Sequence, residues 1–224
     1  MGTYSKISHW KEKMNLEIVS FYSDVDENTY YSDHAKRLIG ECDSLGLQYD
    51  IKEKPSAGTY QKNCLSKPQF ILDKLYEKRK PFVWLDIDSY LFKQPELFDG
   101  MVDRFDIGFA TSIPSIGGIK ASPLFINNTP NCEAFLQTWS HNADAALAEN
   151  KKHFDHEPLF ALVQHFQSQM RIGFVGPEYC VWPRSQNENT VIMMGLSDVD
   201  SKKDNLRAMG MEEGKIEWQS VGTL

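Results

Sequence analysis

The segment from Pro81 to Leu91, PFVWLDIDSYL, decides the fold that the sequence predicts. A short apolar run ends in two aspartates separated by one residue, a pattern typical of a buried strand that reaches the edge of a sheet. Because side chains alternate along an extended segment, we expect Asp86 and Asp88 to share one face while Ile87 points into the core. Two carboxylates on one face suit Mg²⁺ or Mn²⁺, which complete their shells with water and phosphate.

The context of this triplet carries the interpretation, because two aspartates at this spacing are a weak motif by themselves. Asp24-Val25-Asp26 and Asp198-Val199-Asp200 repeat the spacing in polar surroundings that are typical of turns. The triplet at Asp86 follows a strand-like run, and two neighbouring carboxylates are costly to bury without a cation. We therefore predict a metal site at Asp86 and Asp88.

Strand-like and helix-like patterns alternate around this segment. We expect strands over residues 16–22, 48–52, 81–85, 106–111, 122–127 and 171–175, with a further short one at 191–194. We expect helices over 30–45, ended by Gly46, and from Ser66 as N-cap toward residue 78, with later ones opened by Thr129-Pro130 and capped by Asp155. Residues 54–65 are expected to form a loop over a ligand. This alternation predicts an α/β fold with a mostly parallel sheet, in which ligands bind at the carboxyl ends of the strands.

Length and composition limit the classes of protein to which the chain can belong. With 224 residues and 41% apolar content, we expect one domain over 1–224, its core at about 16–185 and a polar segment from about 186 closing over the ligand. A net charge of -7 argues against a nucleic-acid binder. We find no signal peptide and no run near the ~18 to 20 apolar residues of a membrane span, so we expect a soluble cytoplasmic protein without membrane insertion. The widely spaced cysteines predict free thiols.

The segments, taken in order, resemble the GT-A type of nucleotide-diphospho-sugar glycosyltransferase, most nearly the small metal-dependent enzymes encoded by large algal viruses. The resemblance covers residues 16 to 205 and rests on LEIVSFYSD, SKPQFILDKL, FVWLDIDSYLFKQPELF, SPLFINNTPNCEAFLQTW and FDHEPLFALV. It implies a single Rossmann-like GT-A domain that uses Mn²⁺ or Mg²⁺ and transfers a sugar from a nucleoside diphosphate, expected to be UDP, to a hydroxyl acceptor such as a glycan. A viral protein of this kind would act in the host cytoplasm.

The resemblance also implies roles for individual residues. Asp88 would bind the metal directly, and Asp86 would contact the ribose, or the metal through water. Further candidates for binding the donor nucleotide are Tyr22, Ser23, Asp24, Lys67 and Lys202. Candidates for contacts with the sugar or the acceptor are Asn127, Asn128 and His156, and candidates for the catalytic base are Asp155 and Glu157.

Most of these residues have a plain structural alternative. Tyr22 could pack at a strand end, Lys67 could face solvent in the first turn of a helix, and Asp155 could only cap its helix. Ser23, Asp24, Asn127 and Asn128 could only form turns or caps.

The sequence departs from the family pattern near its C-terminus. Met193 and Met194 stand where many relatives have a histidine as a third metal ligand, and a thioether is a poor ligand for a hard cation. Either the metal has fewer protein ligands, or Asp198 or Asp200 substitutes; Lys202 or Lys203 could still close over the diphosphate.

Two other classes of protein remain open at this point. Phosphatases of the haloacid dehalogenase type also have an apolar strand that ends in Asp-x-Asp, but their motif follows the first strand, whereas here the segment is the third expected strand. A non-catalytic module that binds nucleotide sugars is the other alternative. Turnover of a sugar donor would distinguish it from an enzyme.

Overall fold

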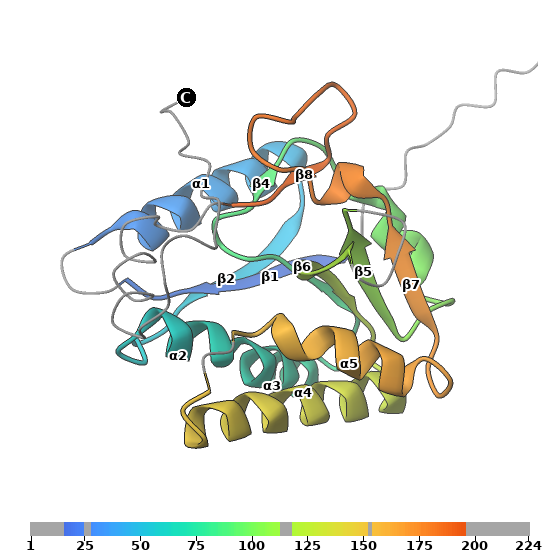
Figure 1. Ribbon diagram of the computed structural model, residues 1–224. Coiled ribbons are helices and arrows are strands. Elements are labelled where there is room, and N and C mark those ends of the chain that lie inside the picture. Colours follow the sequence, from blue (N-terminus) through green and yellow to red (C-terminus); the bar gives the residue numbers. More distant parts are fainter. Residues whose placement is uncertain (1–15, 25–27, 113–117, 152–153, 196–224) are drawn as a thin grey trace, which may run out of the picture.

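The computed structural model describes residues 16–24, 28–112, 118–151 and 154–195. A six-stranded central sheet crosses these residues, with helices on both of its faces (Figure 1). In spatial order its strands are β2 (Gln48–Glu53), β1 (Glu17–Tyr22), β3 (Phe82–Trp84), β6 (Ile119–Ile126), β5 (Ile107–Thr111) and β7 (Ile172–Val175). The pairs β1/β2, β1/β3 and β5/β7 are parallel, and β6 is antiparallel to both of its neighbours. The predicted α/β fold with a mostly parallel sheet is confirmed.

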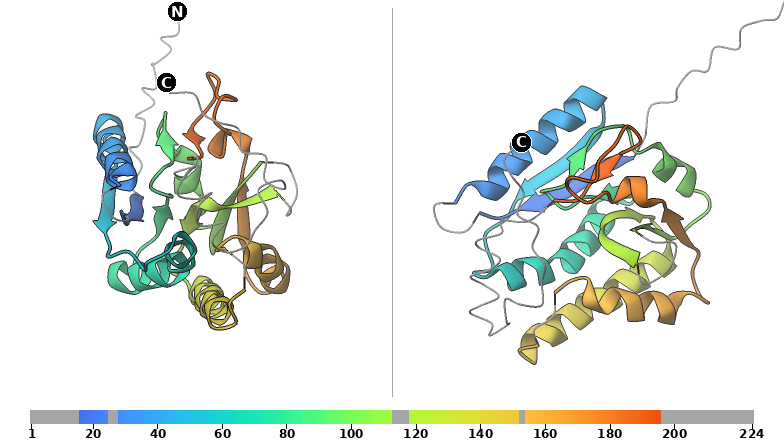
Figure 2. Two further views of the ribbon diagram at one scale, coloured as in Figure 1. Left: turned by 60° about the vertical axis from the view of Figure 1, so that its left-hand side comes forward. Right: turned by 45° about the horizontal axis from the view of Figure 1, so that its top comes forward.

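The helices form two layers. One face carries α1 (Tyr30–Leu45) and a small antiparallel sheet of β4 (Tyr90–Leu91) and β8 (Ile192–Met193). The opposite face carries α2 (Tyr60–Leu65), α3 (Lys67–Lys78), α4 (Pro130–Ala148) and α5 (Glu157–Phe166). Figure 2 shows these two layers from the side. Short 3₁₀ helices, η1 (Glu96–Met101) and η3 (Pro177–Tyr179), lie in connections on the side of the small sheet.

Strand β3 shows why the sheet needs both layers. Val83, with Leu85 just after the strand, packs into the cluster that contains the buried residues of α1. Phe82 and Trp84 pack into the cluster formed with α3, α4 and α5. This alternation follows from the two-residue period of an extended chain, and a strand that is apolar on both faces must be covered on both.

The ends of two helices follow the sequence signals. Helix α1 has the predicted bounds, and Gly46 ends it in the left-handed conformation, at a φ of 66°, which glycine adopts without steric cost. At the start of α4, the Thr129 hydroxyl accepts a hydrogen bond from the Cys132 N–H. Both boundaries are confirmed.

Other boundaries differ from the prediction. Helix α2 forms within the stretch expected to be a loop, and it leads directly into α3. Ser66 occupies the cap position of α3, but its hydroxyl donates to the Asn63 carbonyl at 2.8 Å, so the predicted side-chain cap is wrong. Strand β3 ends at Trp84, and the Ser89 N–H donates to the Asp86 carbonyl at 2.9 Å, which closes a turn. The two aspartates therefore lie in a turn and not in an extended segment.

Two further features are the state of the cysteines and the character of the helices. Each of the four cysteines carries a free thiol, as predicted. None of the helices in the described ranges has both the length and the apolar character that crossing a bilayer would require.

Candidate active site

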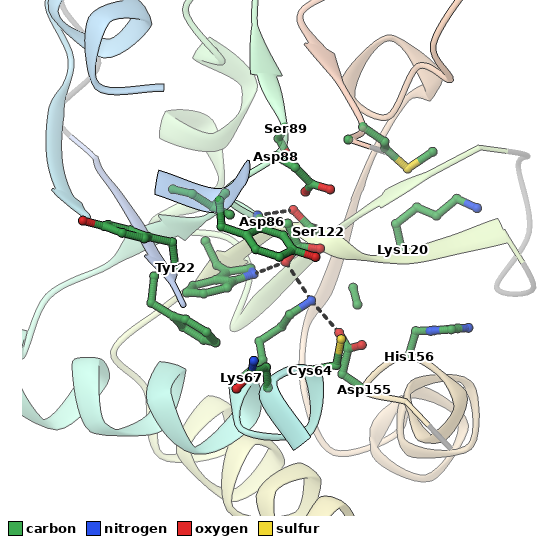
Figure 3. A pocket seen from close by; sticks show the side chains of 18 of the residues that line it. Tyr22, Cys64, Lys67, Asp86, Asp88, Ser89, Lys120, Ser122, Asp155 and His156 are labelled. Atoms are coloured by element: carbon green, nitrogen blue, oxygen red, sulfur yellow. Dashed lines mark hydrogen bonds and ion pairs between the residues drawn. The ribbon is translucent and has the colours of Figure 1, made fainter. Parts of the chain in front are cut away.

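A cavity of about 380 Å³ opens at the carboxyl ends of β1 and β3 (Figure 3). One wall comes from the residues that end β1, from the first turn of α1, and from α2 and the start of α3. The other wall comes from the first half of β6, from the segment before α5 and from residues 182, 194 and 195. The aspartate turn that follows β3 lies between these walls, so the cavity occupies the edge where α/β sheets commonly bind ligands.

Lys67 lines this cavity from the first turn of α3. Its Nζ atom is 2.7 Å from Oδ1 of Asp86 and 2.5 Å from Oδ2 of Asp155, and its side chain is 8% exposed. Burial opposes the charge of Lys67, but the carboxylates of Asp155 and Asp86 outweigh it and raise the pKa of the ammonium group. Lys67 is therefore a permanently charged group held between two carboxylates, and not the solvent-facing lysine of the alternative interpretation.

Two further hydrogen bonds fix Asp86. The indole Nε1 of Trp84 donates to Oδ1 of Asp86 at 3.0 Å. The backbone N–H of Asp86 donates to the hydroxyl of Ser122, on β6, at 2.8 Å. Trp84 thus orients the carboxylate of Asp86, and the backbone of Asp86 is bonded to β6.

The electrostatic environment of Asp86 is unusual. Burial raises the pKa of this carboxyl to about 6 and outweighs the attraction of Lys67, while the nearby carboxylates of Asp155 and Asp88 raise it further. A little over a third of the side chain, 37%, remains exposed. A positive charge bound next to Asp86 would therefore stabilise the charged form of its carboxylate.

Asp88 is more deeply enclosed than Asp86. It is 7% exposed and lines the same cavity. A Cβ atom added at Gly195 would overlap the Asp88 carboxyl group, so only glycine fits where the chain passes over it. The residues that follow β8 therefore cover the carboxylate of Asp88.

Helix α1 holds the turn that carries Asp88. An Nη2 atom of Arg37 donates to the Ser89 carbonyl at 2.9 Å, and the guanidinium lies 3.5 Å from the centroid of the Tyr90 ring. The other side of the guanidinium pairs with Glu41, at 2.7 Å from Nη1 to Oε1. Glu41 also accepts the Leu91 N–H at 2.9 Å. These contacts tie the residues directly after Asp88 to a rigid helix.

The donor atoms of Asp86 and Asp88 fit a hard divalent cation. Both are carboxylates that line one cavity, and Mg²⁺ commonly binds one or two protein carboxylates together with water and phosphate. Across the residues that the structure describes, no group of three or more His, Cys, Asp or Glu side chains could hold a metal. Met194 lines the cavity and Met193 is buried in β8, and neither side chain offers an oxygen ligand. Within the described part of the chain, a cation at Asp86 and Asp88 would therefore complete its shell with water and substrate oxygens.

The residues predicted to contact the nucleotide divide into two groups. Tyr22 and Ser23 line the cavity at its β1 side (Figure 3). Asp24 does not line it, because its Oδ1 accepts the N–H groups of Tyr31 and Ser32, both at 3.0 Å, and so caps α1. Lys202 lies outside the described residues, as do Lys203, Asp198 and Asp200.

Of the three candidate residues at the start of α5, two line the cavity and one does not. Asp155 and His156 line the cavity, with Asp155 6% exposed. His156 holds the cap position of α5, so the cap predicted for Asp155 is wrong: its carboxylate turns toward Lys67 instead. Glu157 does not line the cavity, and its Oε2 accepts the Phe154 N–H at 2.7 Å.

The structure places Asn127 and Asn128 away from the cavity. Because β6 runs antiparallel to β3, its carboxyl end lies at the opposite edge of the sheet from Asp86. The Asn127 side-chain amide donates to the carbonyls of Val102 and Phe105, both at 2.7 Å. Neither asparagine lines the cavity, and this position gives no support to their predicted contacts with a sugar or an acceptor.

Several residues that line the cavity were missed by the sequence analysis. Tyr60, Asn63 and Cys64 were missed because α2 was expected to be a loop. Lys120 and Ser122 were missed because β6 was assumed to present its carboxyl end. The reversed direction of β6 is set by tertiary pairing, and no local pattern of the sequence reports it.

Comparison with known proteins gives one informative result. No protein-family model and no curated protein matches this chain. A solved structure that does match is a glycosyltransferase involved in the glycosylation of the major capsid of PBCV-1, with a TM-score of 0.60 and 12% sequence identity. The match covers 88% of this chain and 100% of that chain. At this identity the likeness shows a shared fold, so the sheet and helical layers described here have the fold of that glycosyltransferase.

Proposed function

We propose that this chain is a metal-dependent glycosyltransferase that moves a sugar from a nucleoside diphosphate, UDP being the expected one, to a hydroxyl acceptor such as a glycan. One observation carries the proposal: Asp86, Asp88, Lys67 and Asp155 converge on one cavity at the carboxyl ends of parallel strands. The shared fold with a glycosyltransferase supports the same conclusion.

The donor would lie along the β1 side of the cavity. Tyr22 and Ser23 would contact the base, and Asp86 and Asp88 would hold Mn²⁺ or Mg²⁺ against the diphosphate. Such a cation neutralises the charge that develops on a leaving diphosphate. Asp86, whose pKa is raised, is suited to this role because a bound cation would favour its charged form. Lys67 keeps a positive charge next to it and limits the repulsion among the carboxylates.

For the acceptor, the geometry favours Asp155 over Glu157 as the general base. A base must come within hydrogen-bond reach of the proton that it removes. Asp155 lines the cavity, whereas the Glu157 carboxylate is engaged by a backbone N–H outside it. His156, with 62% of its side chain exposed, lies at the rim, where it could contact an incoming acceptor.

A thermal-shift comparison tests this proposal. The wild type and Asp88→Asn are each heated with UDP, UDP-glucose or GDP, with and without Mn²⁺. Asp103→Asn serves as the control, because Asp103 is an exposed aspartate outside the cavity. A ligand at ~100 times its dissociation constant stabilises the native state by about 2.7 kcal/mol, which raises the melting temperature of a chain of this size by several degrees.

The expected result is stabilisation by UDP that requires Mn²⁺, is lost in Asp88→Asn and persists in Asp103→Asn. If no nucleotide raises the melting temperature of the wild type, the proposal fails, and hydrolysis of p-nitrophenyl phosphate would then test the phosphatase alternative. If a UDP-sugar binds with Mn²⁺ but neither transfer nor hydrolysis of it follows, the chain is a binding module.

A further inference from the structure

Trp182 is an exposed tryptophan on a well-fixed backbone. It lines the cavity, and 54% of it is exposed to solvent. Its neighbour Val181 is fastened to β8 from both sides, by a bond from its N–H to the Ile192 carbonyl at 3.1 Å and by one from the Met194 N–H to its own carbonyl at 2.9 Å. The Ser185 N–H closes a turn on the Trp182 carbonyl at 3.0 Å. An indole held open to solvent on a fixed backbone offers its face to a ligand rather than to the core.

Lys120 stands over this indole. Its Nζ atom lies 5.2 Å from the centroid of the Trp182 ring, within the range of a cation–π contact. Lys120 comes from the first half of β6 and lines the same cavity. Among the described residues it has no carboxylate within ion-pair distance, unlike the buried Lys67. The rim of the cavity therefore combines an exposed aromatic face with the positive charge of Lys120.

The position of this pair relative to the donor residues indicates which substrate it meets. Figure 3 shows Lys120 and His156 on one side of the cavity and Tyr22 on the other, with Asp86 and Lys67 between them. A sugar that leaves a diphosphate must lie between that diphosphate and its acceptor. If the nucleobase of the donor lies at Tyr22 and its diphosphate lies at Asp86 and Asp88, the acceptor enters from the side of Lys120.

We propose that Trp182 and Lys120 form an acceptor subsite that selects a glycan whose terminal sugar carries a carboxylate. The aliphatic face of the sugar would stack on the indole, and the carboxylate would pair with the ammonium group of Lys120. The inference rests on the proposed function, because it needs a donor in the cavity to define the acceptor side.

The test uses two probes that differ only at one carbon: methyl β-D-glucuronide, with a carboxylate at C6, and methyl β-D-glucoside, with a hydroxymethyl group there. Their binding to the full chain, saturated with UDP and Mn²⁺, is followed by saturation-transfer NMR. We expect the wild type to bind the glucuronide about fivefold more tightly, as for one partly exposed ion pair, with the preference reduced by added salt. Lys120→Ala should bind both probes equally, and Trp182→Ala should bind both more weakly.

Matched controls separate this subsite from general surface effects. Lys80→Ala removes a lysine whose side chain is 51% exposed and which pairs with Glu17, outside the cavity. Phe160→Ala removes an aromatic residue that is 43% exposed on α5 and does not line the cavity. Both controls should keep the wild-type preference for the glucuronide.

Failure of the subsite is distinguishable from failure of the proposed function. If the wild type is stabilised by UDP with Mn²⁺ but binds the two glycosides equally, or binds neither, the subsite is overturned while the donor site stands. If Lys120→Ala loses the stabilisation by UDP, the lysine serves the donor phosphates and the subsite is again overturned. If UDP does not bind the wild type at all, the proposed function itself falls.

Discussion

Oδ2 of Asp155 lies 2.5 Å from Nζ of Lys67, so that the segment before α5 is joined to the first turn of α3 by a pair of buried, oppositely charged groups. The same ammonium group reaches Asp86, and the bridge therefore extends to the turn after β3. One lysine thus lies between two carboxylates that line the cavity.

Replacement of Lys67 by methionine should destabilise the protein. The variant keeps the volume of the side chain but leaves Asp155 and Asp86 without their shared counter-charge, and breaking a buried ion pair from one side typically costs about 3 to 5 kcal/mol. Urea denaturation gives the free energy of unfolding. Lys62→Met, at an exposed lysine of α2, is the control and should change it by less than about 0.5 kcal/mol. Equal stabilities of the two variants would mean that the bridge does not stabilise the fold.

The raised pKa of Asp86 predicts a distinct dependence of stability on pH. Burial raises this pKa to about 6, above the ordinary value of 3.8 for an aspartate, so the native state binds the proton more tightly than the unfolded state does. The stability that this group contributes is therefore fully present below pH 3.8 and is lost as the pH rises through about 6. Asp86→Asn should gain stability relative to the wild type between pH 4 and pH 7, by about 1 kcal/mol once solvent screening of the partly exposed carboxylate is allowed for.

This difference can be measured by urea denaturation at both pH values, with Asp103→Asn as the control. Carbon-detected NMR of the Asp86 carboxyl should give a midpoint near 6. A midpoint near 4 would show that the environment of Asp86 in solution differs from the one described here.

A second charged cluster, on the side of the sheet where α3 ends, predicts the opposite dependence. Asp50 is 9% exposed, and its carboxylate lies 2.8 Å from Nζ of Lys74, 2.7 Å from that of Lys78 and 3.2 Å from that of Lys52. Burial alone would raise the pKa of Asp50, but hydrogen bonds from the three lysines hold it well below its usual range. The group therefore stabilises the protein above its unfolded pKa of about 3.9, and this contribution is lost as the pH falls below that value.

Asp50→Asn should accordingly lower the free energy of unfolding at pH 7 by about 3 kcal/mol, and by less at pH 3, where the wild type has already lost part of the contribution. Asp73→Asn, at an exposed aspartate of α3, should differ little from the wild type at either pH. A difference between Asp50→Asn and the wild type that does not depend on pH would contradict the assignment.

The comparison of sequence and structure shows which inferences local patterns support. Helix α1 and its glycine stop were predicted because periodicity and caps are local signals. The metal site at Asp86 and Asp88 stays a prediction, and one step of its argument was wrong, since the two residues lie in a turn and not in a strand. The bridge from Lys67 to Asp155 could not be predicted, because it depends on how α3 and the segment before α5 pack in space. For the same reason, the position of Asn127 at the edge of the sheet opposite Asp86 could not be predicted: the direction of β6 is a tertiary property.

Arg37 should control how tightly the cavity holds a donor. Its guanidinium fixes the Ser89 carbonyl, next to Asp88, and stacks on Tyr90 while it pairs with Glu41. Lysine keeps the charge but cannot reproduce these forked and stacked contacts. Arg37→Lys should therefore loosen the turn and weaken binding of UDP with Mn²⁺ by about tenfold, which corresponds to ~1.4 kcal/mol.

Titration calorimetry measures this affinity, and urea denaturation of the same samples shows whether the fold itself is weakened. Lys36→Ala, the neighbouring exposed residue on α1, should bind the donor as the wild type does. An unchanged affinity in Arg37→Lys would mean that the turn holds Asp88 in place without the help of α1.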